Sequence, residues 1–114
     1  MSLAQSEAAV TNQTHALATL AQSERNGTAI GAAIALVLDW RPIRRVLDAA
    51  AQRFGIQPPP LDLPGLTETL AVAVAAAETP GVERAMAFGA QQLLIQHRGL
   101  WDLLESRESA RRQG

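Results

Sequence analysis

The 114-residue sequence contains no cysteine, no lysine and no tyrosine. Without cysteine, the chain has no disulfide framework, no thiolate metal ligand and no cysteine nucleophile. Without lysine, it has neither a Schiff-base residue nor a phosphate loop of the G-x-x-x-x-G-K-[ST] type. All ten basic residues are therefore arginine, a usage typical of a GC-rich bacterial or phage genome. These absences remove several classes of enzyme before any motif is considered.

Large aromatic side chains are also scarce, with two tryptophans and two phenylalanines. Hydrophobic residues make up 47% of the chain, and 22 alanines and 15 leucines supply most of them. This content is too apolar for a fully disordered chain. Because alanine buries little surface, the sequence predicts a thin core, which favours a helical interface that more than one chain completes.

The net charge is -1, so no strong overall attraction to nucleic acid or anionic lipid is expected. The apolar run over residues 28–38 is shorter than the roughly 20 residues that span a bilayer. The N-terminus lacks the features of a secretory signal or transit peptide. We therefore expect a cytoplasmic protein, or a virion component if the source is a phage. Gly27 and Gly31 form a G-x-x-x-G pair, which in a soluble protein lets two helices approach closely.

The first 26 residues are predicted to form an N-terminal helical arm. Leu3, Val10 and Leu17 recur every seven residues along an otherwise polar helix, with Leu20 beside them. Such a narrow apolar seam needs a partner surface, although a partly disordered arm is the alternative. Asn26-Gly27 marks the break before the next element.

Two further helices are expected between residues 28 and 54. The first, over 28–38, is apolar on nearly all faces, which is typical of the centre of a bundle or of an oligomer interface. Asp39 is suited to cap a second helix with Pro42 in its first turn, and Gly55 is suited to end it. One long helix kinked at Pro42 is the alternative. The second helix has an apolar stripe formed by Ile43, Val46, Leu47, Ala50 and Phe54.

A Pro-rich joint over residues 56–65 divides the chain near its middle, because consecutive prolines favour an extended polyproline II segment. A helix is expected to begin around Asp62 or Pro64, with Asp62 as its cap and Pro64 in its first turn, and to run to about Glu78. Thr79 and Pro80 are expected to start another, which Gly99 closes, and residues 100–112 form a last helix. The sequence thus predicts an all-α fold, a small bundle of five to six helices, with the arm at 1–26 and a helical domain at 27–114.

No motif with catalytic or metal-binding spacing is present. His15 and His97 are the only histidines, and neither has a partner at metal-ligand spacing. The carboxylates form no calcium loop, and the sequence contains neither G-x-S-x-G nor G-x-G-x-x-G. We therefore predict a protein that is not an enzyme and needs no cofactor.

Residues 41–56 look like the first helix and turn of a helix-turn-helix, with four arginines placed to contact phosphates: Arg41, Arg44, Arg45 and Arg53. The position of the recognition helix is instead occupied by Pro58 and the prolines that follow it, without basic residues. Nucleic-acid binding is therefore an alternative that the sequence does not favour.

The favoured function is a non-enzymatic assembly or adaptor protein that acts through self-association or a protein partner. Its Ala/Gln-rich composition is shared by structural components of phages and secretion systems. A small membrane-active protein, in which the two apolar helices enter lipid together, is the other alternative, and membrane binding is not favoured. The candidate interface residues are Gly27, Gly31, Ile34, Leu38, Trp40, Arg41, Arg44, Arg45 and Trp101.

Overall fold

The computed structural model describes residues 2–113 and contains four helices in that range: α1 (Leu3–Ala21), α2 (Thr28–Arg53), α3 (Leu66–Ala76) and α4 (Pro80–Gln113). These described residues form no strand, so the predicted all-α class is confirmed. The predicted number of five to six helices is wrong. Two helices are longer than expected: α2 continues through the boundary expected at Asp39, and α4 continues through the boundary expected at Gly99.

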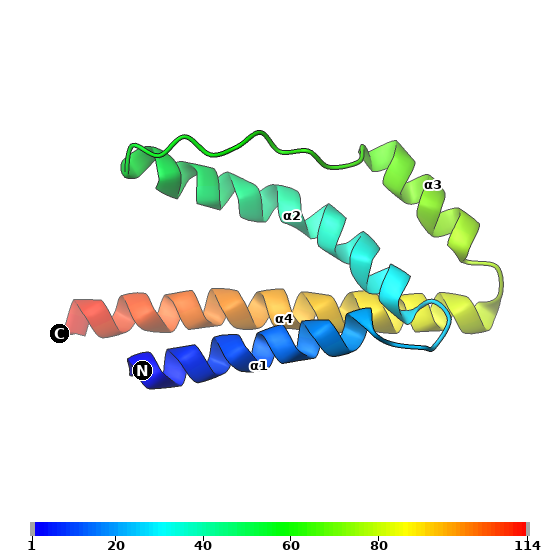
Figure 1. Cartoon of the computed structure of the whole chain (residues 1–114), viewed down its shortest axis with the longest axis horizontal. Helices are drawn as coiled ribbons and strands as arrows, with labels where there is room; N and C mark the ends of the chain where they lie inside the picture. Colours follow the sequence, from blue (N-terminus) through cyan, green and yellow to red (C-terminus); the bar gives the residue numbers. More distant parts are fainter. Residues whose placement is uncertain (1, 114) are drawn as a thin grey trace.

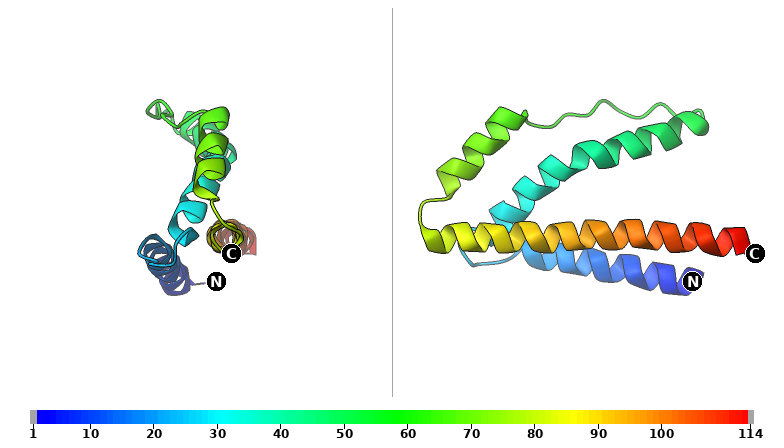
Figure 2. Two further views of the ribbon diagram at one scale, coloured as in Figure 1. Left: turned by 90° about the vertical axis from the view of Figure 1, so that its right-hand side faces the viewer. Right: turned by 180° about the vertical axis from the view of Figure 1, so that it is seen from behind.

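Helix α4 is the longest element, and α1 and α2 pack against it (Figure 1). Helix α1 lies beside α4 and runs antiparallel to it (Figures 1 and 2). Helix α2 starts against the first part of α4, runs in the same general direction and diverges from it, while α3 packs on α2. The molecule is flat, with extents of 53 × 30 × 18 Å, so its thinnest dimension is about two helix diameters.

Helix α1 begins with a capping box that the sequence allows. The Ser2 hydroxyl accepts a hydrogen bond from the backbone N–H of Gln5, and the Gln5 side chain accepts one from Ser2 N–H. The expected seam is only partly packed: Leu17 contacts the core, whereas Leu3 is 64% exposed and Val10 is 46% exposed. Only the C-terminal part of this arm is therefore anchored by apolar contacts to the core.

Helix α2 is a single helix that passes through Pro42, which was the alternative interpretation of residues 28–54. The expected helix start at Asp39 is wrong, because the Asp39 carboxylate is hydrogen-bonded to His97 on α4 and caps no helix. Proline inside a helix removes one backbone hydrogen bond and favours a bend, and α2 changes direction along its length (Figure 1).

Gly55 ends α2 as predicted. Its φ of 68° lies in the left-handed region, where a residue without a Cβ is favoured. Ile56 N–H donates to Ala51 C=O and Gly55 N–H donates to Gln52 C=O, which together form a Schellman motif. The chain then leaves α2 and returns along residues 56–65 as an extended segment toward α3 (Figure 1).

Three further boundaries test the sequence predictions. Thr79 caps α4, since its hydroxyl accepts a hydrogen bond from Val82 N–H, and this prediction is confirmed. The predicted cap at Asp62 is wrong: α3 begins after Gly65. Gly99 does not end a helix either, because α4 continues through it. A methyl group at Gly99 would lie 3.0 Å from the side-chain amide nitrogen of Gln13, so this glycine leaves space for α1.

The core is thin, as the composition predicts. It consists of Ala32, Ala35 and Leu93, with Leu17, Leu20 and Ala90 packed against it. Among the described residues, no large side chain is fully buried. The few buried apolar groups leave most large hydrophobic side chains in contact with solvent.

Candidate self-association surface

The first part of the α2–α4 contact is a close approach of two backbones. A methyl group at Gly31 would overlap the backbone carbonyl of Met86, and one at Gly89 would overlap the carbonyl of Thr28. Ala32 and Ala35 continue this face of α2 and are both buried. Small residues thus let the helices approach through their main chains, as the G-x-x-x-G pair predicts. We call this region, residues 28–39 of α2 and 82–97 of α4, the closed end.

A polar contact marks the limit of the closed end. His97 Nδ1 lies 2.6 Å from Asp39 Oδ2, and the two residues are 58 positions apart in sequence. The His97 side chain is 10% exposed and that of Asp39 is 32% exposed, so water is partly excluded from the pair. The contact joins α2 to α4, which gives His97 a structural role within the fold.

Beyond this pair, the same helix faces continue, and their side chains become progressively exposed. Ile43 and Val46 follow Asp39 by four and seven residues, and Leu100 and Leu104 follow His97 by three and seven. Helical periodicity therefore places them on the faces that meet at the closed end. Ile43 is still buried, but Val46 is 51% exposed and Leu104 is 52% exposed.

The helices diverge where these faces continue (Figure 1), and the apolar side chains there remain open to solvent. Phe54, at the C-cap of α2, is 79% exposed. Trp101, one of the two tryptophans, is 38% exposed. We call this region the open end and define it by six residues: Val46, Leu47, Phe54, Leu100, Trp101 and Leu104.

The arginines of α2 hold the Pro-rich segment in place. Arg41 donates a hydrogen bond of 2.9 Å to the carbonyl of Pro64, and Arg44 donates to the carbonyl of Pro59. Arg44 also pairs with Asp48 at 2.7 Å, and its side chain is only 14% exposed. An extended polyproline segment has no internal hydrogen bonds, so its carbonyls are available to these side chains. Of the three arginines Arg41, Arg44 and Arg45, the first two therefore have hydrogen-bond partners within the chain.

An apolar groove separates α2 from α3. Its residues enclose about 420 Å³, and almost all of the lining surface is hydrocarbon. Ile30 and Val72, on opposite walls, are 37% and 48% exposed. The groove is lined by Ile30, Ala33, Ile34, Val37, Pro64, Glu68, Thr69 and Val72.

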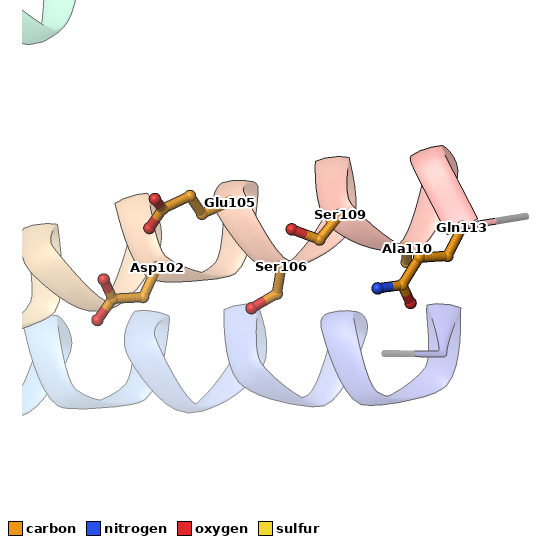
Figure 3. A pocket seen from close by; sticks show the side chains of 6 residues that line it. All are labelled: Asp102, Glu105, Ser106, Ser109, Ala110 and Gln113. Carbon is orange, nitrogen blue, oxygen red and sulfur yellow. The ribbon is translucent and has the colours of Figure 1, made fainter.

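A second hollow, on the C-terminal part of α4, has a different character (Figure 3). Ser106 and Ser109 lie among its polar residues, and Ser106 extends toward α1 in Figure 3. The carboxylates of Asp102 and Glu105 also line it, but no histidine joins them. Hydroxyls without a neighbouring base are weak nucleophiles, so this hollow offers no recognisable chemistry. Across residues 2–113, no group of three or more side chains is arranged to hold a metal ion.

The candidate residues from sequence are distributed over several features. Gly27 and Gly31 pack within the chain, against α4, and Ile34 lines the α2–α3 groove. Leu38 is 39% exposed, and Trp40 is half-buried. Arg45 is exposed, whereas Arg41 and Arg44 bind the Pro-rich segment, and Trp101 belongs to the open end.

Sequence reasoning did not single out most of the open end as an interface. The α2 stripe through Val46 and Phe54 was recognised, but only as the face of an amphipathic helix. On α4, the expected break at Gly99 places Leu100 and Leu104 in a different helix from His97. The signal that finds them is the unbroken spacing of Leu93, His97, Leu100 and Leu104, which requires a helix that continues through Gly99.

Comparison with known proteins gives a family without an assigned activity. The sequence matches a family of unknown function, DUF6975, over residues 1–112, and the chain belongs to this family. No curated protein and no solved structure gives a significant match. None of the helices described here is long and apolar enough to cross a membrane.

Proposed function

We propose that this chain is a non-enzymatic assembly protein that acts by associating with further copies of itself. The observation that carries the proposal is the accessible surface of 8211 Å². A compact monomer of 12.1 kDa exposes about 6,000 Å², so this chain exposes about 2,200 Å² more than its mass requires. Surface of this extent that is rich in apolar side chains supports contact with another protein.

The shape of the chain supports the same proposal. Its radius of gyration is 16.6 Å, whereas a compact domain of this length has about 13 Å. Exposed large hydrophobic residues occur on all four helices and on the Pro-rich segment, with Val74 at 77% and Phe54 at 79%. A flat chain with a thin core is typical of a subunit whose packing is completed on assembly. The composition supports a setting as a structural component of a phage or secretion-type assembly.

Sedimentation velocity and light scattering on the wild-type chain test this proposal. At micromolar concentration we expect a mass that is a multiple of 12.1 kDa and that falls on dilution. A mass of one chain that persists up to about 100 μM would contradict self-association. Repeating the measurement in high salt separates apolar association, which persists, from charge pairing, which is screened.

Membrane association is a second candidate, favoured by the surface of α3. Leu70, Val72 and Val74 are each about half or more exposed, and Glu68 is the single charged residue of this helix. This apolar surface is the feature that favours lipid contact, although α3 lacks the basic polar face that is typical of interfacial helices. Flotation with neutral and anionic liposomes tests the idea: protein in the lipid fraction supports it, and protein that stays at the bottom of the gradient removes it.

Nucleic-acid binding receives less support from the geometry than from the sequence. Arg41 and Arg44 donate to carbonyls of the Pro-rich segment and lie in the middle of α2. Arg45 and Arg53 also lie on the surface of this stretch, as does Arg41. We therefore do not propose a DNA-binding role.

A further inference from the structure

We infer that the second copy docks on the open end, with the C-terminal half of α2 from one copy against the C-terminal half of α4 from the other. This inference rests on the proposed self-association and assigns it a surface. Val46 and Leu104 carry it, because they extend the two faces that pack together at the closed end. At the open end each face lacks the partner that it has at the closed end.

The available area fits a stable dimer. An obligate homodimer buries about 1,000 to 2,500 Å² on each subunit, and a standard interface about 800 Å². The excess surface of about 2,200 Å² belongs to the whole chain, so an open end that supplies about a third of it reaches the standard size. Trp101 and Phe54 are large apolar anchors of the kind that dominate interface energetics.

The charges that flank the open end are complementary between two copies. Residues 41–53 of α2 carry four arginines and Asp48, which gives a net charge of +3. Residues 98–108 of α4, which flank Leu100 and Leu104 on both sides, carry three carboxylates against Arg98 and Arg107, which gives -1, and Arg111 and Arg112 follow at the end of the helix. A two-fold symmetric pair that places each α2 against the partner's α4 therefore brings opposite charges together twice. Pairing α2 with α2 would instead place like charges side by side.

The α2–α3 groove is the competing surface, and it supplies a matched control. Val72 lines the groove and is 48% exposed, while Val46 at the open end is 51% exposed. Replacing either valine by glutamate adds the same charge to a surface of the same exposure in the unassociated chain. Only the variant at the true interface places the carboxylate in a desolvated contact, where an unpaired charge is strongly unfavourable.

The experiment compares the dissociation constants of wild type, Val46→Glu, Leu104→Glu and Val72→Glu by sedimentation equilibrium, with circular dichroism to confirm helix content. We expect Val46→Glu and Leu104→Glu to weaken association by about 100-fold or more and Val72→Glu to change it less than about threefold. If wild type associates and Val72→Glu alone weakens it, or if no variant does, the open end is not the interface and self-association stands. A wild type that stays monomeric overturns both proposals.

A second measurement does not depend on the glutamate variants remaining folded. In a Trp40→Phe chain, Trp101 is the single tryptophan and reports on the open end. We expect its emission to shift to shorter wavelength as the protein is concentrated through the association range, because the indole leaves water. Emission that stays constant while the mass rises would show that Trp101 lies outside the interface, and it would overturn the assignment.

Discussion

The two ends of the α2–α4 pair use the same helix faces with opposite results. At the closed end, Gly31 and Gly89 let the backbones meet, and Leu93 beside them is only 4% exposed. At the open end, the same faces carry the larger side chains Val46 and Leu104, yet both are about half exposed. Leu93 and Leu104 are the same size, so their difference in burial follows from the distance between the helices, which the small residues shorten at the closed end. The closed end is complete within one copy, whereas the open end needs a further surface.

The largest difference between the two ends is expected from truncation of matched leucines. In the Val46→Glu background, Leu93→Ala should lower the free energy of unfolding by about 3 kcal/mol, because it removes buried contacts and leaves a cavity. Leu104→Ala should lower it by less than about 1 kcal/mol, since that side chain is exposed in the single copy. Urea denaturation of both variants gives the values. Equal losses in the free energy of unfolding would contradict the claim that only the closed end is packed within one copy.

Adding a methyl group tests the close approach itself. Gly89→Ala should destabilise the chain by about 2 to 3 kcal/mol, because the new Cβ overlaps the carbonyl of Thr28. In an exposed helix interior the same change would stabilise by about 1 kcal/mol, so the sign of the effect is diagnostic. Gly81→Ala, in the first turn of the same helix, is the control: the nearest atoms lie 3.8 Å from the added carbon, so the change should be neutral or slightly stabilising. A stabilising Gly89→Ala would disprove the backbone contact.

The Asp39–His97 pair at the limit of the closed end should contribute less to the free energy of unfolding than Leu93 or the close approach at Gly89. A double-mutant cycle of Asp39→Ala and His97→Ala should give a coupling of about 1 to 2 kcal/mol, because a charge-assisted hydrogen bond in a partly dry site is stronger than an exposed one. Thermal unfolding at one fixed pH measures the four chains. Additive effects of the two substitutions would show that the residues do not interact.

The smallest effect is expected at the Pro-rich segment. Arg44→Ala removes a hydrogen bond to Pro59 and the pair with Asp48, and should cost about 1 kcal/mol. It should also expose residues 56–65 to faster cleavage by a protease that cuts after leucine. Arg45→Ala is the matched control, since Arg45 is exposed. Similar cleavage rates in the two variants would mean that the segment does not depend on Arg44.

Local signals in the sequence predict the ends of several helices but not their continuity. Gly55, Thr79 and Pro80 act through the backbone of a few residues, so their roles follow from the sequence alone. Gly99 has the same local character, but α1 lies against it and the helix continues. Whether a helix ends at such a glycine depends on contacts with residues distant in sequence, and the helix preferences of single residues carry no information about those contacts.

The candidate self-association surface was likewise predictable from the sequence only in part. The alanine content predicts a thin core, and the glycine pair predicts a close approach of two helices. Both features are found in the structure. The arginine cluster was expected to face a partner, but Arg41 and Arg44 bind carbonyls of the Pro-rich segment, a contact that spans up to 23 residues. The divergence of α2 from α4 is a tertiary property, and therefore the exposure of Val46 and Leu104 required the structure.

Hydrogen exchange over a series of protein concentrations compares the two ends in a single experiment. Amides of residues 43–54 and 98–108 should gain protection as the concentration rises, because the second copy covers the open end. Amides of residues 28–35 and 85–93 should show the same protection throughout, since the closed end is complete in one chain. Protection at residues 43–54 and 98–108 that does not change with concentration would contradict the view that the open end is finished by a second copy.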